Sequence, residues 1–199
     1  MPGRAVVISG PSGVGKTAVC DALTARDPRF VRSVSATTRA ARPGEEDGRA
    51  YHFVGEAEFR RGIEEGRFLE WAEVYGRLYG TPREPVERAV REGRFVLLNI
   101  DVQGAAKVRE SGLDALFIFL VPPGRADLER RLRGRGTDGE AAIARRLAVA
   151  DREMEERRLY DHCVLNDDLA RAADEVRAIV ERETAARSAA RAAGRGRGA

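Results

Sequence analysis

Eight consecutive residues near the amino terminus have the types and spacing needed to hold a phosphate. They read Gly10-Pro11-Ser12-Gly13-Val14-Gly15-Lys16-Thr17 and match the pattern GxxxxGK[ST]. Glycines there let backbone N–H groups converge on phosphate oxygens, the lysine reaches the β and γ phosphates, and the threonine hydroxyl can bind Mg²⁺. The alternative, an ordinary glycine-rich turn, would match by chance only about once in a thousand chains. We therefore expect nucleotide binding.

This loop alone does not distinguish GTPases, ATPases and kinases. A GTPase would need an Asn-Lys-x-Asp guanine motif, and the nearest string, Asn166-Asp167-Asp168-Leu169, lacks the lysine. A kinase needs a second anionic site for its phosphate acceptor. Arg39 and Arg42, with the phenols of Tyr51 and Tyr79, could supply one, because two guanidinium groups can grip a monophosphate. Each residue alone could be a surface arginine or a core tyrosine, but together with the phosphate loop they favour a nucleotide kinase.

The elements that must position these residues alternate in type. Short apolar runs rich in branched residues alternate with longer stretches of helical period, which predicts an α/β fold with a mainly parallel sheet. Strands are predicted at residues 5–9, 30–35, 95–100, 115–121 and 163–165. Helices are predicted at residues 16–26, 56–65, 82–92, 103–110, 124–134, 139–157 and 167–183. One helix should open with Thr81 as N-cap, Pro82 as its first residue and Glu84 in a capping box.

Two stretches interrupt the alternation of strands and helices. Residues 35–80 contain a short helix and segments that alternate enough for antiparallel strands, so we expect an inserted small subdomain. Residues 132–140 link two predicted helices through glycines and arginines, a composition that suits a mobile lid.

Length and composition are those of a soluble globular protein with one domain. The 199 residues are 43% apolar and 34% charged, which excludes a disordered, collagen-like or disulfide-stabilised protein. The longest apolar run, residues 115–121, is too short to cross a bilayer, and the amino terminus has no secretory pattern, so we expect a cytoplasmic protein.

The net charge of +3 would suggest nucleic-acid binding if it were spread over the chain, but it is concentrated at the carboxyl end. Residues 182–199 hold five arginines and one glutamate. We expect this tail to fray from the preceding helix into disorder, and we expect no nucleic-acid partner.

Taken together, the motifs make the chain resemble the guanylate kinase family over nearly all of its length up to about residue 183. The resembling stretches are ISGPSGVGKT at 8–17, SVSATTRxxRxGExxGxxYxF at 33–53, FLEWA at 68–72, YGT at 79–81, IDxQG at 100–104, RLxxRGT at 131–137, RRL at 145–147 and NDDL at 166–169. The resemblance implies transfer of the γ-phosphoryl group of ATP to GMP, and to dGMP, giving ADP and the diphosphate.

The resemblance also implies a three-part fold. It predicts a core of residues 1–34, 82–124 and 147–183, a GMP-binding subdomain of residues 35–81, a lid of residues 125–146 and a basic tail of residues 184–199.

Roles for individual residues follow from the same resemblance. The phosphate loop with Asn166 and Asp167 would bind ATP, and Thr17 would bind the accompanying Mg²⁺. The GMP phosphate would be held by Ser35, Arg39, Arg42, Tyr51 and Tyr79. Guanine would be contacted by Glu70, Thr81 and Asp101, because its N1–H and N2–H₂ donors suit a carboxylate and its O6 suits a hydroxyl. Charge in the transferring phosphoryl group would be neutralised by Lys16, Arg42, Arg135 and Arg146, without a general base.

One position departs from the family pattern. Asn99 stands two residues before Asp101, where the family ordinarily has an acidic residue. An amide keeps the hydrogen bonds but lacks a negative charge near the phosphates and the metal, so the handling of Mg²⁺ is the property most open to change.

Two other functions remain compatible with the fold. One is a kinase with a different phosphate acceptor, against which Glu70, Thr81 and Asp101 argue. The other is a non-catalytic guanylate-kinase-like binding module, against which the intact Lys16 and Thr17 argue. The sequence leaves the oligomeric state, the choice between GMP and dGMP and the use of the tail open.

Overall fold

Two β-sheets organise this computed structural model, which describes residues 2–49, 51–74, 76–134 and 139–195. The first sheet is wholly parallel, and its strands, in spatial order, are β2 (Phe30–Arg32), β7 (Phe95–Asn99), β1 (Arg4–Ser9), β8 (Ala115–Val121) and β9 (His162–Leu165). The second sheet consists, in spatial order, of β4 (His52–Phe53), β3 (Ala36–Thr37), β6 (Arg77–Pro82) and β5 (Phe68–Val74). The predicted α/β class is confirmed.

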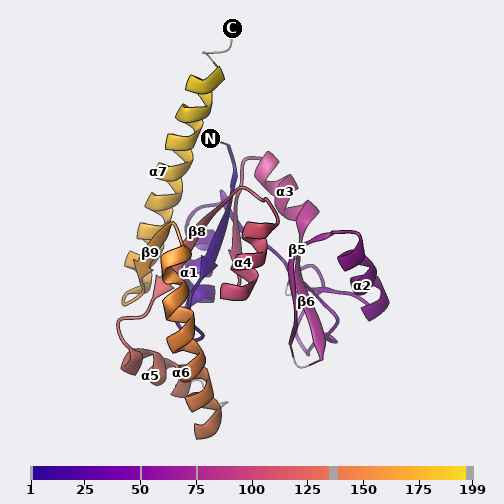
Figure 1. Ribbon diagram of the computed structural model, residues 1–199, viewed down its shortest axis with the longest axis vertical. Coiled ribbons are helices and arrows are strands. Elements are labelled where there is room, and N and C mark those ends of the chain that lie inside the picture. Colours follow the sequence, from indigo (N-terminus) through magenta and orange to yellow (C-terminus); the bar gives the residue numbers. More distant parts are fainter. Residues whose placement is uncertain (1, 50, 75, 135–138, 196–199) are drawn as a thin grey trace.

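Helices cover both faces of the first sheet, and others lie outside it. The helices are α1 (Lys16–Arg26), α2 (Glu56–Glu64), α3 (Arg83–Arg91), α4 (Val102–Glu110), α5 (Arg125–Arg133), α6 (Glu140–Glu155), α7 (Leu169–Arg195) and the short 3-10 helix η1 (Glu156–Leu159). On one face of the sheet lie α1 and α7, and on the other lie α3 and α4 (Figure 1).

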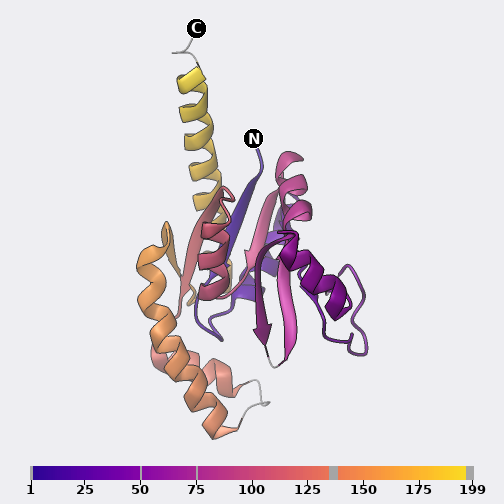
Figure 2. The same ribbon diagram turned by 45° about the vertical axis from the view of Figure 1, so that its right-hand side comes forward.

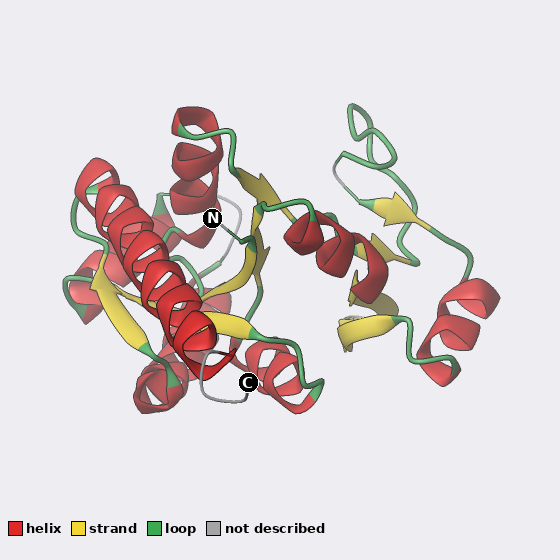
Figure 3. Ribbon diagram, turned by 90° about the horizontal axis from the view of Figure 1, so that it is seen from above, coloured by secondary structure: helices red, strands yellow, loops and turns green. Residues whose placement is uncertain are grey.

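Two smaller bodies project from this core on opposite sides. The helices α5 and α6 form one, and the second sheet with α2 forms the other (Figure 2). Seen from above, the second sheet lies beyond α3, on the side away from α7 (Figure 3). Each body has its own apolar cluster: Leu128, Leu132, Ile143, Leu147 and Ala150 in the first, and Ala36, Phe59 and Leu78 in the second.

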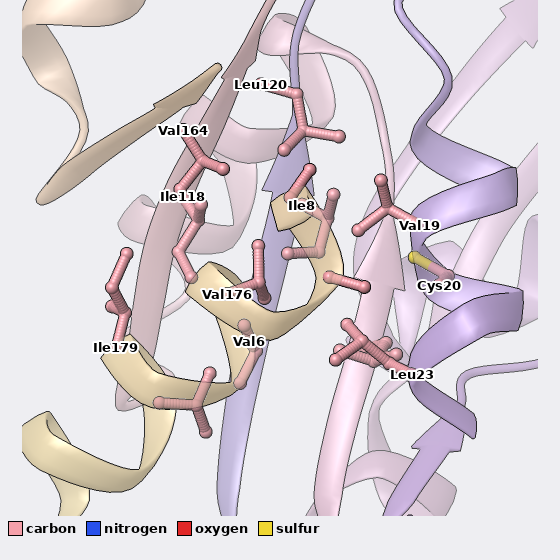
Figure 4. Close-up of a cluster of buried hydrophobic side chains, with 14 of the residues drawn as sticks. Val6, Ile8, Val19, Cys20, Leu23, Ile118, Leu120, Val164, Val176 and Ile179 are labelled. Carbon is pink, nitrogen blue, oxygen red and sulfur yellow. The ribbon is translucent and has the colours of Figure 1, made fainter. Parts of the chain in front are cut away.

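The central strand β1 shows why the first sheet needs helices on both faces. Successive side chains of a strand point to opposite faces. Accordingly, Val6 and Ile8 lie in the cluster under α1 and α7, and Ala5 and Val7 lie in the cluster under α3 and α4. Figure 4 shows the first cluster, in which Val176 of α7 lies among side chains of the sheet. A continuous apolar run is therefore required in β1, as in other strands that are buried on both faces.

Strand β2 is shorter than predicted. It ends at Arg32, not at residue 35, because the chain leaves this edge of the first sheet and enters the second sheet as β3. The antiparallel pairing predicted within residues 35–80 is confirmed by β5 and β6.

The predicted start of the helix after residue 81 is wrong in its capping. Thr81 belongs to β6, and Pro82, whose backbone is extended (φ −62°, ψ 132°), is the N-cap of α3. The Thr81 hydroxyl instead donates to Glu70 Oε1 at 2.6 Å. The Thr81 hydroxyl therefore joins strands β5 and β6 and does not cap the helix.

The expectation that the chain frays into disorder after residue 183 is wrong for residues 184–195. Helix α7 continues to Arg195, and this stretch holds six alanines, the strongest helix formers. Thr184 is buried (2% exposed), and Arg187 forms an ion pair with Asp114. The helix is therefore anchored past residue 183.

In the part of the chain that the structure describes, no helix has the length and apolarity to cross a membrane.

Ending the chain after residue 183 is expected to lower the melting temperature by about 2 to 4 °C, as for a loss near 1 kcal/mol in a protein of this size. The physical reason is the loss of the buried Thr184 and of the Arg187–Asp114 ion pair. Ending the chain after residue 190 should have little effect, and neither truncation should change kcat. Calorimetric melting of both truncated proteins tests this, and equal melting temperatures would contradict it.

Candidate active site

The phosphate loop joins β1 to α1 with the geometry that its glycines predict. Gly10 (φ +140°) and Gly15 (φ +104°) adopt conformations that L side chains rarely take. A Cβ on Gly10 would meet the Leu120 carbonyl oxygen at 2.5 Å, and one on Gly15 would meet the Asn166 amide nitrogen at 2.6 Å. The backbone therefore leaves no room for side chains at these positions, and its N–H groups can approach a ligand closely.

Lys16 is held at the edge of this loop. Its Nζ donates to the carbonyl oxygens of Gly10 at 2.6 Å and of Pro11 at 3.3 Å. The ammonium is thus placed beside the loop's N–H groups, where a triphosphate would meet it.

Two side chains from the carboxyl-terminal half of the chain hold the phosphate loop by hydrogen bonds. Both the Asn166 amide (2.7 Å) and the Arg131 guanidinium (2.8 Å) donate to the Val14 carbonyl oxygen. Arg131 also donates to the Asn166 carbonyl oxygen at 2.8 Å. Asn166, predicted to contact ATP, is buried (5% exposed) and binds the loop itself. Asp167 faces α7, where Arg171 lowers the pKa of its carboxyl group.

The end of β7 connects the loop to the second sheet. The Asn99 amide donates to Thr17 Oγ1 at 3.0 Å. Two residues later Asp101 caps α4, because its Oδ1 accepts from the Gly104 N–H at 2.8 Å. Asn99, at the end of β7, thus reaches the phosphate loop, and Asp101, two residues later, lies near Glu70 in the second sheet.

Glu70 is a buried carboxylate with a defined partner. It is 9% exposed, and it accepts from the hydroxyl of Thr81, which is 1% exposed. Burial raises the pKa of Glu70, and the nearby Asp101 carboxylate raises it further, against the lowering effect of the Thr81 hydrogen bond. A Cβ on Gly104 would lie 3.4 Å from Glu70 Oε2 and 3.5 Å from Asp101 Oδ1. The three residues predicted to contact guanine are thus brought together.

Lys107 fastens the second sheet to the core. Its ammonium lies 4.9 Å from the centre of the Trp71 ring and donates to the Trp71 carbonyl oxygen. Because Trp71 follows Glu70 in β5, this contact between α4 and β5 also positions Glu70.

The arginine pair predicted to bind the acceptor phosphate surrounds a carboxylate. Arg39 forms a bidentate pair with Glu45, with both N···O distances at 2.9 Å, and Glu45 also accepts from the Arg42 N–H at 2.8 Å. This pairing raises the pKa of Arg39 and lowers that of Glu45. The Arg39 guanidinium lies over the Tyr51 ring, 5.4 Å from its centre. The ring centres of Tyr51 and Tyr79 are 5.9 Å apart.

Three further residues are predicted for the site, and the structure describes two of them, Ser35 and Arg146. Ser35 precedes β3, and its carbonyl oxygen accepts from the His52 N–H at 2.9 Å. Arg146 is half-buried on α6, and Arg135 lies outside the described residues.

Sequence patterns missed Arg131, Glu45, Lys107 and Glu153 as members of the site. Glu153, on α6, accepts from the Ser12 N–H in the phosphate loop at 3.3 Å. The resembling stretches contained Arg131 and Glu45, but only their contacts show what they hold. Nothing in the sequence near Lys107 or Glu153 marks a contact with a distant segment.

Comparisons with known proteins agree with this geometry. The family model described as guanylate kinase matches residues 2–183. A guanylate kinase of Symbiobacterium thermophilum is 50% identical over 183 residues, which cover 92% of this chain and 87% of that protein. A guanylate kinase of Synechocystis is 48% identical over 170 residues, 85% of this chain and 89% of that protein.

A solved structure shows the same likeness in three dimensions. The crystal structure of guanylate kinase from Anaplasma phagocytophilum matches with a TM-score of 0.70 and 37% identity, covering 92% of this chain and 86% of that one. With its phosphate loop, its second sheet and these matches over about nine-tenths of its length, this chain belongs to the guanylate kinase family.

Proposed function

We propose that this protein catalyses the ATP-dependent phosphorylation of GMP, and of dGMP, to the diphosphate, the reaction of the guanylate kinase family. The observation that carries the proposal is the buried Glu70–Thr81 pair, linked through the end of β7 to an intact phosphate loop. Such a site joins recognition of a base to phosphoryl transfer.

Acceptor specificity follows from hydrogen-bond types. Guanine presents N1–H and N2–H₂ as neighbouring donors, which the carboxylates of Glu70 and Asp101 can accept, and the Thr81 hydroxyl can turn toward O6. Adenine offers an acceptor at N1, which would leave a buried carboxylate facing a lone pair. Leaving a buried polar group unpaired is costly, so the pocket excludes adenine. None of these contacts requires the ribose 2′-hydroxyl.

Phosphoryl transfer in this site needs charge neutralisation and no general base. The acceptor is the phosphate of GMP, which is already anionic at neutral pH. Arg39 and Arg42, with Ser35, Tyr51 and Tyr79, hold that phosphate, and Lys16 holds the β and γ phosphates of ATP. Arg146 and Arg135 would neutralise charge on the transferring group, while Asn166 and Arg131, which donate to the Val14 carbonyl oxygen, maintain the loop on which ATP binds.

The donor set suits Mg²⁺ bound together with ATP. Among the described residues, no group of three or more His, Cys, Asp or Glu could hold a metal ion by itself. Mg²⁺ keeps several waters and is bound in such sites largely by substrate phosphates, and the Thr17 hydroxyl would be the ligand that the phosphate loop contributes. When bound, the ion neutralises charge on the β and γ phosphate oxygens. A cytoplasmic location is part of this proposal, because both substrates are cytoplasmic nucleotides.

A coupled assay with ATP, Mg²⁺ and each of GMP, AMP, UMP and CMP tests the function. Rapid ADP release with GMP alone is the expected result. Preference for another monophosphate would favour the kinase with a different acceptor, and nucleotide binding without turnover would favour a binding module.

The substitution Glu70→Gln is expected to reduce kcat/KM for GMP by about 10- to 100-fold, the effect of placing one donor against the donors of guanine at roughly 1–3 kcal/mol. The KM for ATP should change little, because Glu70 lies on the second sheet. Steady-state kinetics with each substrate varied measures both, and an unchanged kcat/KM for GMP would remove Glu70 from the guanine site.

The substitution Asn99→Asp is expected to lower the Mg²⁺ concentration for half-maximal activity by about threefold to tenfold, because it adds one negative charge beside Thr17. Calorimetric titration of the ATP-loaded protein with Mg²⁺ should show the same increase in affinity. If neither quantity moves, residue 99 does not influence the metal.

A further inference from the structure

Helix α6 places a carboxylate on the phosphate loop. The Ser12 N–H, inside the loop, donates to Glu153 Oε2 at 3.3 Å, although the two residues are 141 positions apart. The Lys16 ammonium is close enough to act on Glu153 electrostatically, and so is the Asp101 carboxylate. Glu153 is half-buried, and burial raises the pKa of its carboxyl group. The contact therefore lies among the charged groups of the ATP site.

A carboxylate in this position resembles the ligand that the loop is built to bind. Backbone N–H groups of such loops converge on phosphate oxygens, which are anionic acceptors like those of a carboxylate. The Glu153 carboxylate and a triphosphate are both negative, and both are attracted to the N–H groups of the loop and to the Lys16 ammonium. They cannot occupy the loop together without strong repulsion.

The helix that carries Glu153 also carries Arg146. The two residues are seven positions apart in α6, which is close to two helical turns, so they lie on the same face of the helix. A displacement of Glu153 that moved α6 would therefore move the lid arginine as well.

We propose that Glu153 is a positioning residue whose carboxylate competes with the triphosphate of ATP for the Ser12 N–H of the phosphate loop, so that binding of ATP releases α6 and with it Arg146. This inference rests on the proposed function, because it takes ATP as the ligand of the loop. It makes the arrival of the phosphoryl donor the event that frees the lid helix.

The test compares Glu153→Gln with the matched control Glu155→Gln, an exposed glutamate of the same helix. Glutamine keeps an acceptor for the Ser12 N–H but removes the competing charge. Calorimetry without GMP should show that Glu153→Gln binds both ATP and inorganic triphosphate about threefold to tenfold more tightly than wild type, the range for one like charge at a solvated site. Affinity for GMP should be unchanged.

A kinetic measurement separates this role from a merely structural one. In Glu153→Gln the KM for ATP should fall by the same factor while kcat stays within about twofold, since Glu153 has already left the loop in the reacting complex. Glu153→Ala should shift triphosphate affinity in the same direction. Unchanged or weaker triphosphate binding in Glu153→Gln, or an equal gain in Glu155→Gln, would overturn the inference. Failure of the wild-type protein to bind ATP would overturn the proposed function as well.

Discussion

Lys16→Met is expected to lower kcat by about 10³-fold or more with both substrates saturating, while the protein stays folded. The Lys16 ammonium stands beside the loop carbonyls of Gly10 and Pro11, where it would meet the β and γ phosphates. It neutralises charge that grows in the transition state, and such electrostatic contributions are among the largest in phosphoryl transfer. Steady-state rates at saturating ATP and GMP, with a melting curve to verify folding, measure the effect.

The chain supplies a matched control, because its only other lysine is Lys107. Lys107→Met removes the contact with Trp71 and should raise the KM for GMP, with kcat within about threefold of wild type. If both substitutions reduced kcat equally, loss of a lysine charge in general, and not the phosphate loop, would explain the result.

Arg146→Ala is expected to lower kcat by about 10² to 10⁴-fold, while GMP affinity measured without ATP stays nearly constant. The reason is that an arginine reaching the transferring phosphoryl group stabilises the transition state more than the ground state. Arg135→Ala should behave alike.

Arg39→Ala provides the contrast, because Arg39 lies in the acceptor pocket with Tyr51 and Glu45. It should weaken GMP binding itself. Calorimetric GMP titrations and saturating rates for the three variants separate the two roles, and an equal loss of GMP affinity in all of them would refute the division between lid and acceptor pocket.

Elements with clear local boundaries could be predicted nearly residue for residue. Helix α1 at 16–26 begins where the phosphate-loop motif requires a helix, and strand β8 at 115–121 is an uninterrupted apolar run between Asp114 and Pro122. The two-residue strands β3 and β4 could not be predicted, since two residues have no period. The predicted end of helix α7 at residue 183 is too early, because the low complexity of residues 184–195 suggests disorder although their alanines favour helix.

The candidate site also contains residues that the sequence predicts and residues that only the structure shows. The phosphate loop follows from a local motif, whereas Glu70 and Thr81 follow from the family resemblance. The local pattern at Thr81 favours a helix cap, and only the β5–β6 pairing shows that its hydroxyl contacts Glu70. Arg131 and Glu153 meet the loop from 117 and 141 positions away. Spacing along the chain contains no information on such contacts, because they depend on how α5 and α6 pack beside the first sheet.

The burial of Glu70 also affects the stability of the nucleotide-free protein. Because its carboxyl pKa is raised in the folded state, the folded chain binds this proton more tightly than the unfolded chain does. Ionisation of Glu70 therefore opposes folding above that raised pKa, and the opposition disappears as the pH falls below the ordinary value of 4.5. Above that raised pKa the carboxylate is a buried charge whose donor is the Thr81 hydroxyl, and the N–H groups of guanine would add further donors. The substrate base would in this sense complete the solvation of a buried ion, so we expect bound GMP to contribute part of the protein's heat resistance.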